Sequence, residues 1–593
     1  MEPTVVPSLT RPPGANDGAG DGAGDRTDRN RTDGTDGTDG GRPVATGGPQ
    51  GTSEVDEGLG GRWRQAAVAV VVVVLVAGLV LRFWTRSAMW LDEALTVDIA
   101  KLPLHDLPSY LKRDGAPPLY YVLLHVWMEV FGTSDLGARS LSGVISVATL
   151  PLAWLAARRF GGRTVAWVVL VLLASAPFAV YYGTEARMYS LVMLLTACGL
   201  LALGRAVEAP RPGNLVALAL VSAALLYTQY WALYLLGALG LRLLWLIWRR
   251  PGDERRRAVL ALCAVLAGFV IFVPWAPIFI YQSRHTGTPW AAPPNFGAVI
   301  NAVTGFTDNQ ATLSTAGSNQ GRLLAVGYFV LAGLGLFGVA RDRRHIDLDI
   351  RTRHKPRGLS FVIAATLVAA IGGGIISGSA FSPRYAAVVF VPLLLLIGLG
   401  SLTLADPRVR AVVIAVLAVS GLVAAGQNVV TQRTQAPRVA AVLAAHAHAG
   451  DIVAMCPDQL GPAVFRLTAA GGYQETTYPR GTSPAYVDWV DYKQVAEASH
   501  PLVFARALER RAGIAHDVWL VSAPGYQGFG EKCQQLAGDL LSAPGWGAHQ
   551  WVNTNPAEYY EPMGLTQFAP PRTTGASVGP PATVTAVPAR GSP

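Results

Sequence analysis

The sequence has few charged residues and few cysteines. Only 15% of its 593 residues are charged, whereas soluble globular domains carry about 25%. This shortage excludes a single soluble globular domain. The four cysteines include no Cys-x-x-Cys pair, so nothing indicates a metal cluster or a redox-active dithiol. Apolar residues make up 51% of the chain, and between 66 and 430 they form Leu/Val/Ala runs of nearly membrane-spanning length.

Polar residues collect at the two ends of the chain. Residues 1–61 have the low-complexity centre DGAGDGAGDRTDRNRTDGTDGTDGG, which cannot bury enough apolar area to offset the chain entropy lost on folding. We therefore predict a disordered cytoplasmic tail there and a second disordered tail at 570–593. The first apolar run, 66–81, is flanked by arginines and is followed by no small-residue cleavage site. It is predicted to be an uncleaved signal-anchor helix.

Basic loops indicate the orientation, because short loops rich in Lys and Arg stay in the cytoplasm. The basic segments are 158–163, 249–257, 341–355 and 408–410. They share one side only if the short run 117–131, which contains His125 and Glu129, does not cross the bilayer. We expect that run to lie flat or re-entrant at the outer surface, since a central charge costs about 2.5–3.5 kcal/mol. About eleven spans result: 66–83, 139–157, 164–182, 188–207, 214–230, 231–248, 258–280, 322–340, 359–380, 386–404 and 411–430.

An odd number of spans places everything after residue 431 outside the cytosol. Normal polarity returns over 435–568, where DIVAMCP and DVWLVSAP are typical of short buried strands and EKCQQLAGDLL has helical spacing. The predicted fold is a polytopic α-helical membrane protein, with a transmembrane domain at 62–430 and an extracytoplasmic α/β domain at 435–568. Cys456 and Cys533 lie in the α/β domain and could form a disulfide outside the cytosol.

Four polar clusters fall on the predicted outer side of the membrane. They are MWLDEALTVD with Asp92 and Glu93, YYGTEARMY with Glu185 and Arg187, FSPRY with Arg384, and the long loop 281–321 with His285. Solvation or snorkelling would explain any one of them, but together they bring charges from distant parts of the chain to one surface. Because adjacent residues point in different directions, we expect one carboxylate of Asp92 and Glu93 to act. The other is expected to be held by a cation or a hydrogen bond.

An ordered set of motifs carries a resemblance to a known superfamily. The set comprises LDEA, GAPPLYY, FGTSDLGARS, the YxxEARMY turn and the late SPRY. It resembles the polyprenyl-phosphate-sugar-dependent glycosyltransferases of the GT-C superfamily, with protein O-mannosyltransferases and lipid A aminoarabinose transferases as the nearest relatives, and it covers residues 84–405. The resemblance implies a GT-C-like catalytic domain. It also implies transfer of a sugar, usually with inversion, from a polyprenyl phosphate to an extracytoplasmic protein, lipid or cell-wall glycan.

The resemblance also implies roles for the clustered residues. Asp92 and Glu93 are the expected catalytic residues. Asp92 is expected to be the general base that takes the proton of the acceptor hydroxyl. The predicted donor phosphate-binding residues are Arg384 and Arg187, because a guanidinium matches a phosphate with its fork of donors. The predicted substrate-binding residues are Glu185, Tyr120, Tyr121 and His285.

Some relatives have been described with a divalent metal ion, but no ligand spacing in this sequence demands one, and no other cofactor is expected. One position departs from the family pattern. In the aminoarabinose transferases a lysine precedes PPL, whereas this chain has Ala116, and Lys112 or Arg113 could substitute for it. The expected partners are a polyprenyl-phosphate sugar, an extracytoplasmic acceptor and the lipid bilayer, and no nucleic acid, because the net charge of +9 is first explained by membrane topology.

Two other functions remain open from the sequence. A transporter or lipid flippase would place ionisable residues near the bilayer midplane and would show internal repeats. Arg242 is the main charged residue within a predicted span, and no convincing repeat is visible. The second alternative is a non-catalytic membrane protein whose outer domain binds a cell-wall polymer.

Overall fold

The computed structural model describes residues 53–571, apart from 288–296, 298–299, 301–303, 308–318, 344, 350–353, 378–380, 525 and 527. Chain contacts divide the protein into Met1–Arg62 and Trp63–Pro593, and the features below belong to the second unit. Most of the predicted loop 281–321 and nearly all of the predicted tails lie outside the described residues. Helix α1 (Ser53–Leu81) begins within the stretch predicted to be the N-terminal tail.

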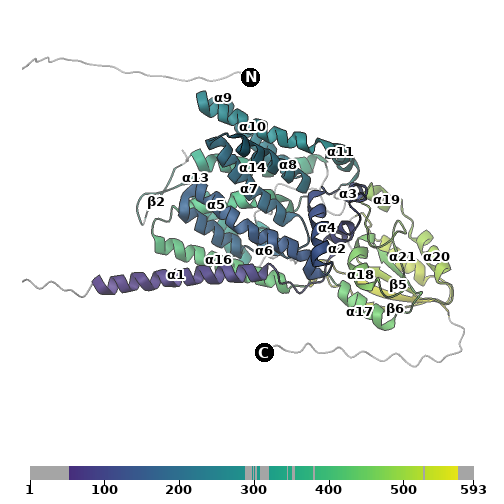
Figure 1. The fold of residues 1–593 in the computed structure, drawn as a ribbon. Helices are drawn as coiled ribbons and strands as arrows, with labels where there is room; N and C mark the ends of the chain where they lie inside the picture. The colour runs from purple at the N-terminus through teal and green to yellow at the C-terminus, as the bar shows by residue number, and fades with distance from the viewer. Residues whose placement is uncertain are drawn as a thin grey trace, which may run out of the picture. The chain divides into compact units, whose positions relative to one another are not determined.

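Helices dominate the chain up to residue 430 (Figure 1). After α1 they are α2 (Leu91–Ala100), α3 (Leu107–Asp114), α4 (Leu119–Phe131), α5 (Asp135–Ser175), α6 (Pro177–Gly183), α7 (Tyr189–Glu208), α8 (Pro212–Thr228), α9 (Ala232–Arg249), α10 (Gly252–Phe272), η1 (Val273–Trp275), α11 (Ala276–His285), α13 (Asn319–Phe337), α14 (His354–Ser377), η2 (Pro383–Ala386), α15 (Ala387–Ser401) and α16 (Pro407–Val430). A small antiparallel pair, β1 (Gly338–Ala340) and β2 (Ile346–Leu348), lies between α13 and α14.

The polytopic helical class predicted from the sequence is confirmed. Within the described residues, 8 helical segments are long and apolar enough to cross a membrane, and Gln65–Leu81 and Pro212–Thr228 are shorter apolar helices. The first two spans predicted after α1 fall largely within α5, which has 41 residues and is broken at Gly162, where φ is 86°. A left-handed φ of this kind favours glycine. The number of crossings stays a prediction.

Helix α15 forms the centre of the helical part and is buried at every residue except Leu399. It packs closely on α13 through two glycines. A Cβ atom on Gly335 would lie 2.5 Å from the carbonyl oxygen of Leu396, and one on Gly400 would lie 1.7 Å from that of Leu331. Small residues at such contacts let two helix backbones approach each other. This packing fixes the position of η2, the short segment before α15 that carries Arg384.

The C-terminal part, from Ala436 onward, is an α/β unit built on one five-stranded sheet with the order β4-β3-β5-β7-β6. Strands β4, β3 and β5 are parallel, and β7 and β6 are antiparallel. The elements are α17 (Ala436–His446), β3 (Ile452–Cys456), η3 (Asp458–Leu460), α18 (Gly461–Thr468), β4 (Gln474–Thr477), α19 (Tyr492–Ala498), α20 (Pro501–Ala512), β5 (Val518–Ser522), α21 (Lys532–Leu541), β6 (Gly547–Val552) and β7 (Gly564–Ala569). A disulfide joins Cys456 to Cys533, as the sequence allowed.

The α/β unit contacts the ends of α3 and α11 and packs on α2. Trp489 donates its main-chain N–H to the carbonyl oxygen of Arg113 at 3.2 Å, and Asp491 donates its own to the carbonyl oxygen of His285 at 2.8 Å. Thr286 and Val490 form an isolated β-bridge. Helix α18 also packs on α2, and Figure 1 shows α2, α3 and α4 between the long helices and the sheet. These contacts place the α/β unit directly beside the cluster containing Asp92.

Candidate active site

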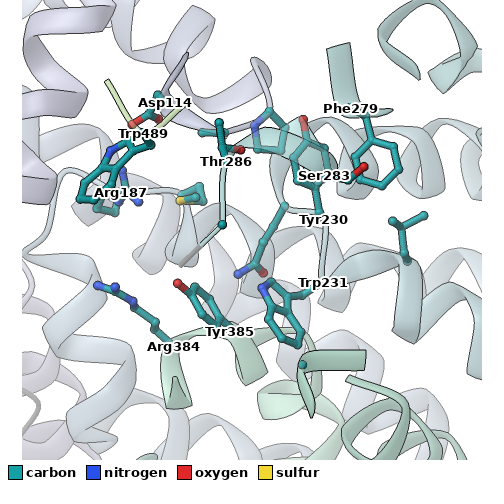
Figure 2. A pocket seen from close by; sticks show the side chains of 18 of the residues that line it. Asp114, Arg187, Tyr230, Trp231, Phe279, Ser283, Thr286, Arg384, Tyr385 and Trp489 are labelled. Atoms are coloured by element: carbon teal, nitrogen blue, oxygen red, sulfur yellow. The ribbon is translucent and has the colours of Figure 1, made fainter. Parts of the chain in front are cut away.

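A cavity of ≈ 490 Å³ lies where α2, the end of α3, the turn before α7, α9, α11, α14 and η2 meet the α/β unit (Figure 2). Its charged lining residues are Asp92, Asp114, Arg187 and Arg384. Its aromatic lining residues are Tyr189, Tyr230, Trp231, Tyr234, Phe279, Tyr385 and Trp489. A cavity lined mainly by aromatic and apolar side chains with a few charged groups is typical of a ligand-binding site.

Asp92, Arg384 and Arg187 meet in this cavity although they come from three distant parts of the chain. The Arg384 Nη1 atom donates a hydrogen bond to the Asp92 Oδ2 atom at 2.7 Å. The Arg187 Nη2 atom lies 3.8 Å from the same oxygen. Arg187 is oriented by a 2.8 Å hydrogen bond from its Nη1 atom to the hydroxyl of Thr96, one helical turn after Asp92. Two guanidinium groups that flank one carboxylate form a ready site for an anion such as a phosphate.

Glu93 lies behind the cavity rather than on its wall. Its two carboxylate oxygens accept hydrogen bonds of 2.6 Å from the Nε and Nη2 atoms of Arg139, and a third contact comes from Arg433 at 3.4 Å. The main-chain N–H of Ala186 donates to it at 3.0 Å. Burial alone would raise the pKa of Glu93, but Arg139 and Arg433 hold it below its ordinary value. The carboxylate held by cations is therefore Glu93, and the one that faces the cavity is Asp92.

Glu185 supports the cavity from outside its lining. Its Oε1 atom accepts a hydrogen bond of 2.9 Å from the indole N–H of Trp90. The ring of Trp90 in turn lies 5.9 Å from the guanidinium carbon of Arg384. Burial raises the pKa of Glu185 to about 7. Glu185 thus positions an aromatic ring beside Arg384.

The other predicted substrate-binding residues are placed differently from the expectation. Tyr120 and Tyr121 are each 1% exposed. Their hydroxyl groups are held by Ser142 at 2.7 Å and by Asp114 at 2.7 Å. Neither ring is among the described residues that line the cavity, so the rings are not available to stack on a ligand there. His285 lies 3.1 Å from a carboxylate oxygen of Asp491 and connects α11 to the α/β unit.

Sequence reasoning missed Asp114, the Trp231–Tyr385 pair and Trp489. The rings of Trp231 and Tyr385 stack with centroids 4.9 Å apart and planes 10° apart. Asp114 precedes GAPPLYY directly, and Tyr385 follows Arg384 directly, so both were within reach of the motif analysis. Trp489 had no motif signal, because only the folded α/β unit brings it to the cavity.

The alternative cations Lys112 and Arg113 are not part of the described lining, and the Lys112 ammonium lies 3.9 Å from the centroid of the Tyr281 ring.

The donor set does not suit a divalent metal. No group of three or more His, Cys, Asp or Glu side chains placed to hold an ion occurs in the described part of the chain. Two carboxylates line the cavity, and Asp92 is paired with Arg384 at 2.7 Å. The described lining of the cavity therefore does not form a site for a divalent metal.

The chain is similar to known proteins in sequence over part of its length and in its fold. Residues 115–278 match the family described as dolichyl-phosphate-mannose-protein mannosyltransferase. No curated protein sequence matches the chain. Among solved structures, the chain is similar to ArnT from Cupriavidus metallidurans bound to undecaprenyl phosphate, with 15% identity and a TM-score of 0.52, over 84% of this chain and 97% of that chain. The apo state of the same ArnT gives 15% identity and a TM-score of 0.50, over 85% and 98% of the two chains.

At this level of identity the similarity establishes the fold. The chain shares the fold of ArnT, and the GT-C-like fold implied by the sequence motifs is confirmed. Fold similarity does not by itself define an activity. An activity must therefore be inferred from the residues of the cavity.

Proposed function

We propose that this protein is an integral-membrane glycosyltransferase that moves a sugar from a polyprenyl-phosphate carrier to an extracytoplasmic acceptor. The observation that carries the proposal is the position of Asp92, 2.7 Å from Arg384 and 3.8 Å from Arg187, on the wall of one cavity. The family match at 115–278 and the fold shared with ArnT, whose structure was solved with undecaprenyl phosphate, support the same substrate class.

The two arginines would bind the phosphate of the donor. The phosphate leaves as a stable anion, so it needs charge neutralisation more than a proton, and Arg384 and Arg187 supply two positive charges. When the phosphate takes over the guanidinium groups, the Asp92 carboxylate is released from its ion pair. It can then accept a proton. Preorganised charges of this kind, aimed at a leaving group, stabilise the transition state without reorganisation during the reaction.

The chemical step follows from this arrangement. The acceptor hydroxyl oxygen forms a bond to the anomeric carbon while the bond from that carbon to the phosphate oxygen breaks. Asp92 takes the hydroxyl proton, and the polyprenyl phosphate leaves with the electron pair. The transition state has oxocarbenium character, and direct displacement inverts the anomeric configuration. Base catalysis of this type contributes about 10² to 10⁴ in rate.

The rest of the cavity suits the remainder of the donor. Leu233, Tyr234 and Phe279 line it on the side of α9 and α11, and Gly373 and Gly374 line it on α14. This apolar portion would receive the first isoprene units, which continue into the bilayer between the helices. The rings of Trp231 and Tyr385 stack on each other, and the Tyr385 ring centroid lies 5.5 Å from the guanidinium carbon of Arg384 (Figure 2). They replace Tyr120 and Tyr121 as the proposed aromatic wall for the donor.

The protein is proposed to be a multi-pass protein of the cell membrane. In the proposed orientation the N-terminus lies in the cytoplasm and the α/β unit lies outside the cytosol. The disulfide between Cys456 and Cys533 supports it, because disulfides persist in oxidising compartments. The charged lining gathers beside the α/β unit, at one end of the helical part, whereas a transporter keeps such groups near the bilayer midplane. This distribution favours an enzyme over the transporter and flippase alternatives.

The proposal is tested with purified full-length protein and a panel of polyprenyl-phosphate sugars. Release of the free polyprenyl phosphate is followed by mass spectrometry, with and without an extract of cell-envelope glycans, lipids and proteins as acceptor. We expect one donor to release carrier in an acceptor-dependent manner, and the Asp92→Asn variant to lose that activity. Carrier release by no donor, or equal release by Asp92→Asn, would overturn the proposed function.

A further inference from the structure

One wall of the cavity is built from three chain segments that the donor chemistry does not use. They are 113–116 at the end of α3, 283–287 at the end of α11, and 489–491 of the α/β unit, and the contacts between Trp489 and Arg113 and between Thr286 and Val490 hold them together. Gly115 has a φ of +85°, and a Cβ atom there would lie 2.8 Å from the Thr286 hydroxyl oxygen. The wall is therefore closely packed before any ligand binds.

Asp114 presents a carboxylate on this wall. One oxygen, Oδ2, accepts a 2.7 Å hydrogen bond from the hydroxyl of Tyr121. The other oxygen accepts none from the residues that the structure describes. The pKa of Asp114 is raised above its ordinary value, mainly by burial and also by the negative charge of Asp92. The Arg187 guanidinium offsets part of this rise. Asp114 thus has one acceptor oxygen available to a ligand in the cavity.

Trp489 supplies an aromatic surface next to this carboxylate, since its main chain is bonded to the residue before Asp114. The indole is 8% exposed and packs on the ring of Tyr492 with centroids 5.0 Å apart. The hydroxyl of Tyr492 donates a hydrogen bond to Asp458, which directly follows β3 and its cis-proline. Trp489 is therefore fixed by the sheet of the α/β unit and not by a free loop.

A carboxylate beside a rigid aromatic ring is a recognition pattern for a sugar. The C–H face of a sugar ring packs on the aromatic face, and the hydroxyl groups around its edge donate to the carboxylate. A peptide side chain such as serine or threonine offers a hydroxyl but no ring face to cover the indole. The chemistry of this wall thus fits a saccharide better than a peptide.

We propose that Asp114 and Trp489 form the acceptor subsite of the cavity, that the subsite binds a sugar residue, and that the acceptor is consequently a glycan. This inference rests on the proposed function. Arg187 separates the two subsites, because its Nη2 atom lies 3.8 Å from Asp92 while its Nη1 atom lies 3.4 Å from the hydroxyl of Tyr121, the partner of Asp114. The donor phosphate and the acceptor sugar would bind on opposite sides of this one side chain.

The acceptor subsite is tested with full-length wild-type protein and the variants Trp489→Ala, Trp489→Phe and Asp114→Asn. Trp551→Ala is the matched control, because Trp551 lies in β6 of the same unit and packs on His446 with centroids 4.1 Å apart. The acceptor probes are a panel of manno-, arabino- and galacto-oligosaccharides and a threonine-containing peptide. The readouts are the KM for the acceptor, the KM for the donor, and carrier release without acceptor.

We expect an oligosaccharide to be the better acceptor and Trp489→Ala to raise its KM about tenfold, the loss expected for one aromatic contact. Asp114→Asn should raise it about tenfold or more, the loss expected for a hydrogen bond to a charged group. The KM for the donor should stay unchanged in both variants, and Trp489→Phe and Trp551→Ala should resemble the wild type. An unchanged acceptor KM in Asp114→Asn and Trp489→Ala, or transfer to the peptide alone, would overturn the inference.

Direct binding separates this inference from the proposed function. If no donor releases carrier, the proposed function fails, and calorimetric titration of the donor-free protein with the same oligosaccharides still decides the acceptor subsite. Binding that is lost in Asp114→Asn supports the subsite, and binding that is absent or unchanged contradicts it. Where Trp489→Ala does not fold, as judged by its thermal transition, Trp489→Leu fills the volume without an aromatic ring and takes its place.

Discussion

Glu561 of the α/β unit accepts a 3.0 Å hydrogen bond from the main-chain N–H of Leu91, the first residue of α2. The first N–H groups of a helix have no partner within the helix, and here a residue 470 positions later in the chain supplies one. The next residue of α2 is Asp92. The α/β unit therefore fixes the turn of helix that carries the proposed base.

The titration of Glu561 should be visible in the pH dependence of stability. Burial raises its pKa from an ordinary value of 4.5 to about 8, so the folded protein binds this proton more tightly than the unfolded chain. Its contribution to the free energy of unfolding is complete below about 4.5 and is lost as the pH rises through about 8. Glu561→Gln keeps an acceptor for Leu91 and cannot titrate. The fall in apparent Tm between pH 5 and pH 8.5 should be smaller in Glu561→Gln than in the wild type, and an equal fall would contradict the pKa shift.

Asp92→Asn should reduce sugar transfer by about 10² to 10⁴, the contribution of a general base. The protein should still fold, because the amide oxygen can accept the hydrogen bond from Arg384 that the carboxylate accepts at 2.7 Å. Asp98→Asn is the matched control, since Asp98 lies further along α2 and pairs with Lys101 at 3.0 Å. Initial rates at saturating donor, compared with the thermal transitions of both variants, distinguish lost catalysis from lost folding. Transfer by Asp92→Asn within twofold of the wild type would remove this residue from the mechanism.

Arg384→Ala should raise the KM for the donor and lower kcat/KM by about 10- to 100-fold, the loss expected for a hydrogen bond between charged groups. Arg384→Lys should recover part of this loss, because lysine restores the charge without the planar fork of donors. Arg322→Ala, at an exposed arginine near the start of α13, is the control. Measurement of kcat/KM across a donor concentration series checks this prediction. A donor KM that does not respond to Arg384→Ala would exclude a phosphate contact.

Glu93→Gln should destabilise the protein rather than alter its chemistry selectively. Removing the carboxylate charge leaves Arg139 and Arg433 buried without their anion, a change that typically costs about 3–5 kcal/mol. Glu129→Gln is the control, because Glu129 is 67% exposed and its partner is His125. Thermal unfolding in detergent should show a large fall in Tm for the first variant and almost none for the second. Similar Tm values for the two variants would contradict a structural role for Glu93.

Breaking the disulfide should loosen the α/β unit. Cys456 and Cys533 are separated by 77 positions, and a cross-link that closes a long loop commonly contributes about 2–4 kcal/mol. We expect Cys456→Ser to lower the apparent Tm, and Cys263→Ser, at an exposed free cysteine, to leave it unchanged. Differential scanning fluorimetry with and without a reducing agent measures both effects. Equal Tm values for the oxidised wild type and Cys456→Ser would show that the bond does not constrain the fold.

Sequence reasoning was strongest where a physical property is repeated along the chain. The apolar runs predicted the helical class. The return of normal polarity after residue 435, together with the short strand-like segments around Cys456 and Ser522, predicted an α/β unit. Loop charges placed Asp92, Arg187 and Arg384 on one surface, and the structure brings these three side chains to one cavity. Such properties depend on near neighbours in the sequence, so local patterns are enough to reveal them.

Long-range pairing was beyond the same reasoning. Glu93 meets Arg433 across 340 positions, and no local pattern distinguishes this arginine from a loop residue. Trp489 reaches the cavity only because the sheet and the segment at Asp491 fix it there. The same holds for Tyr120 and Tyr121. An aromatic pair near a polar motif suggested stacking on a ligand, but the local pattern could not reveal that both side chains are buried and that their hydroxyl groups are hydrogen-bonded within the protein.

The ion cluster around Glu93 has a consequence for biosynthesis. Arg433 follows the last long helix, α16, and its main-chain N–H also bonds the hydroxyl of Ser87 at 2.8 Å. Arg139 can pair with Glu93 early in synthesis, but the second cation of the cluster is supplied only after nearly three quarters of the chain has been made. The complete cluster of one buried acid and two arginines therefore forms only at a late stage of synthesis.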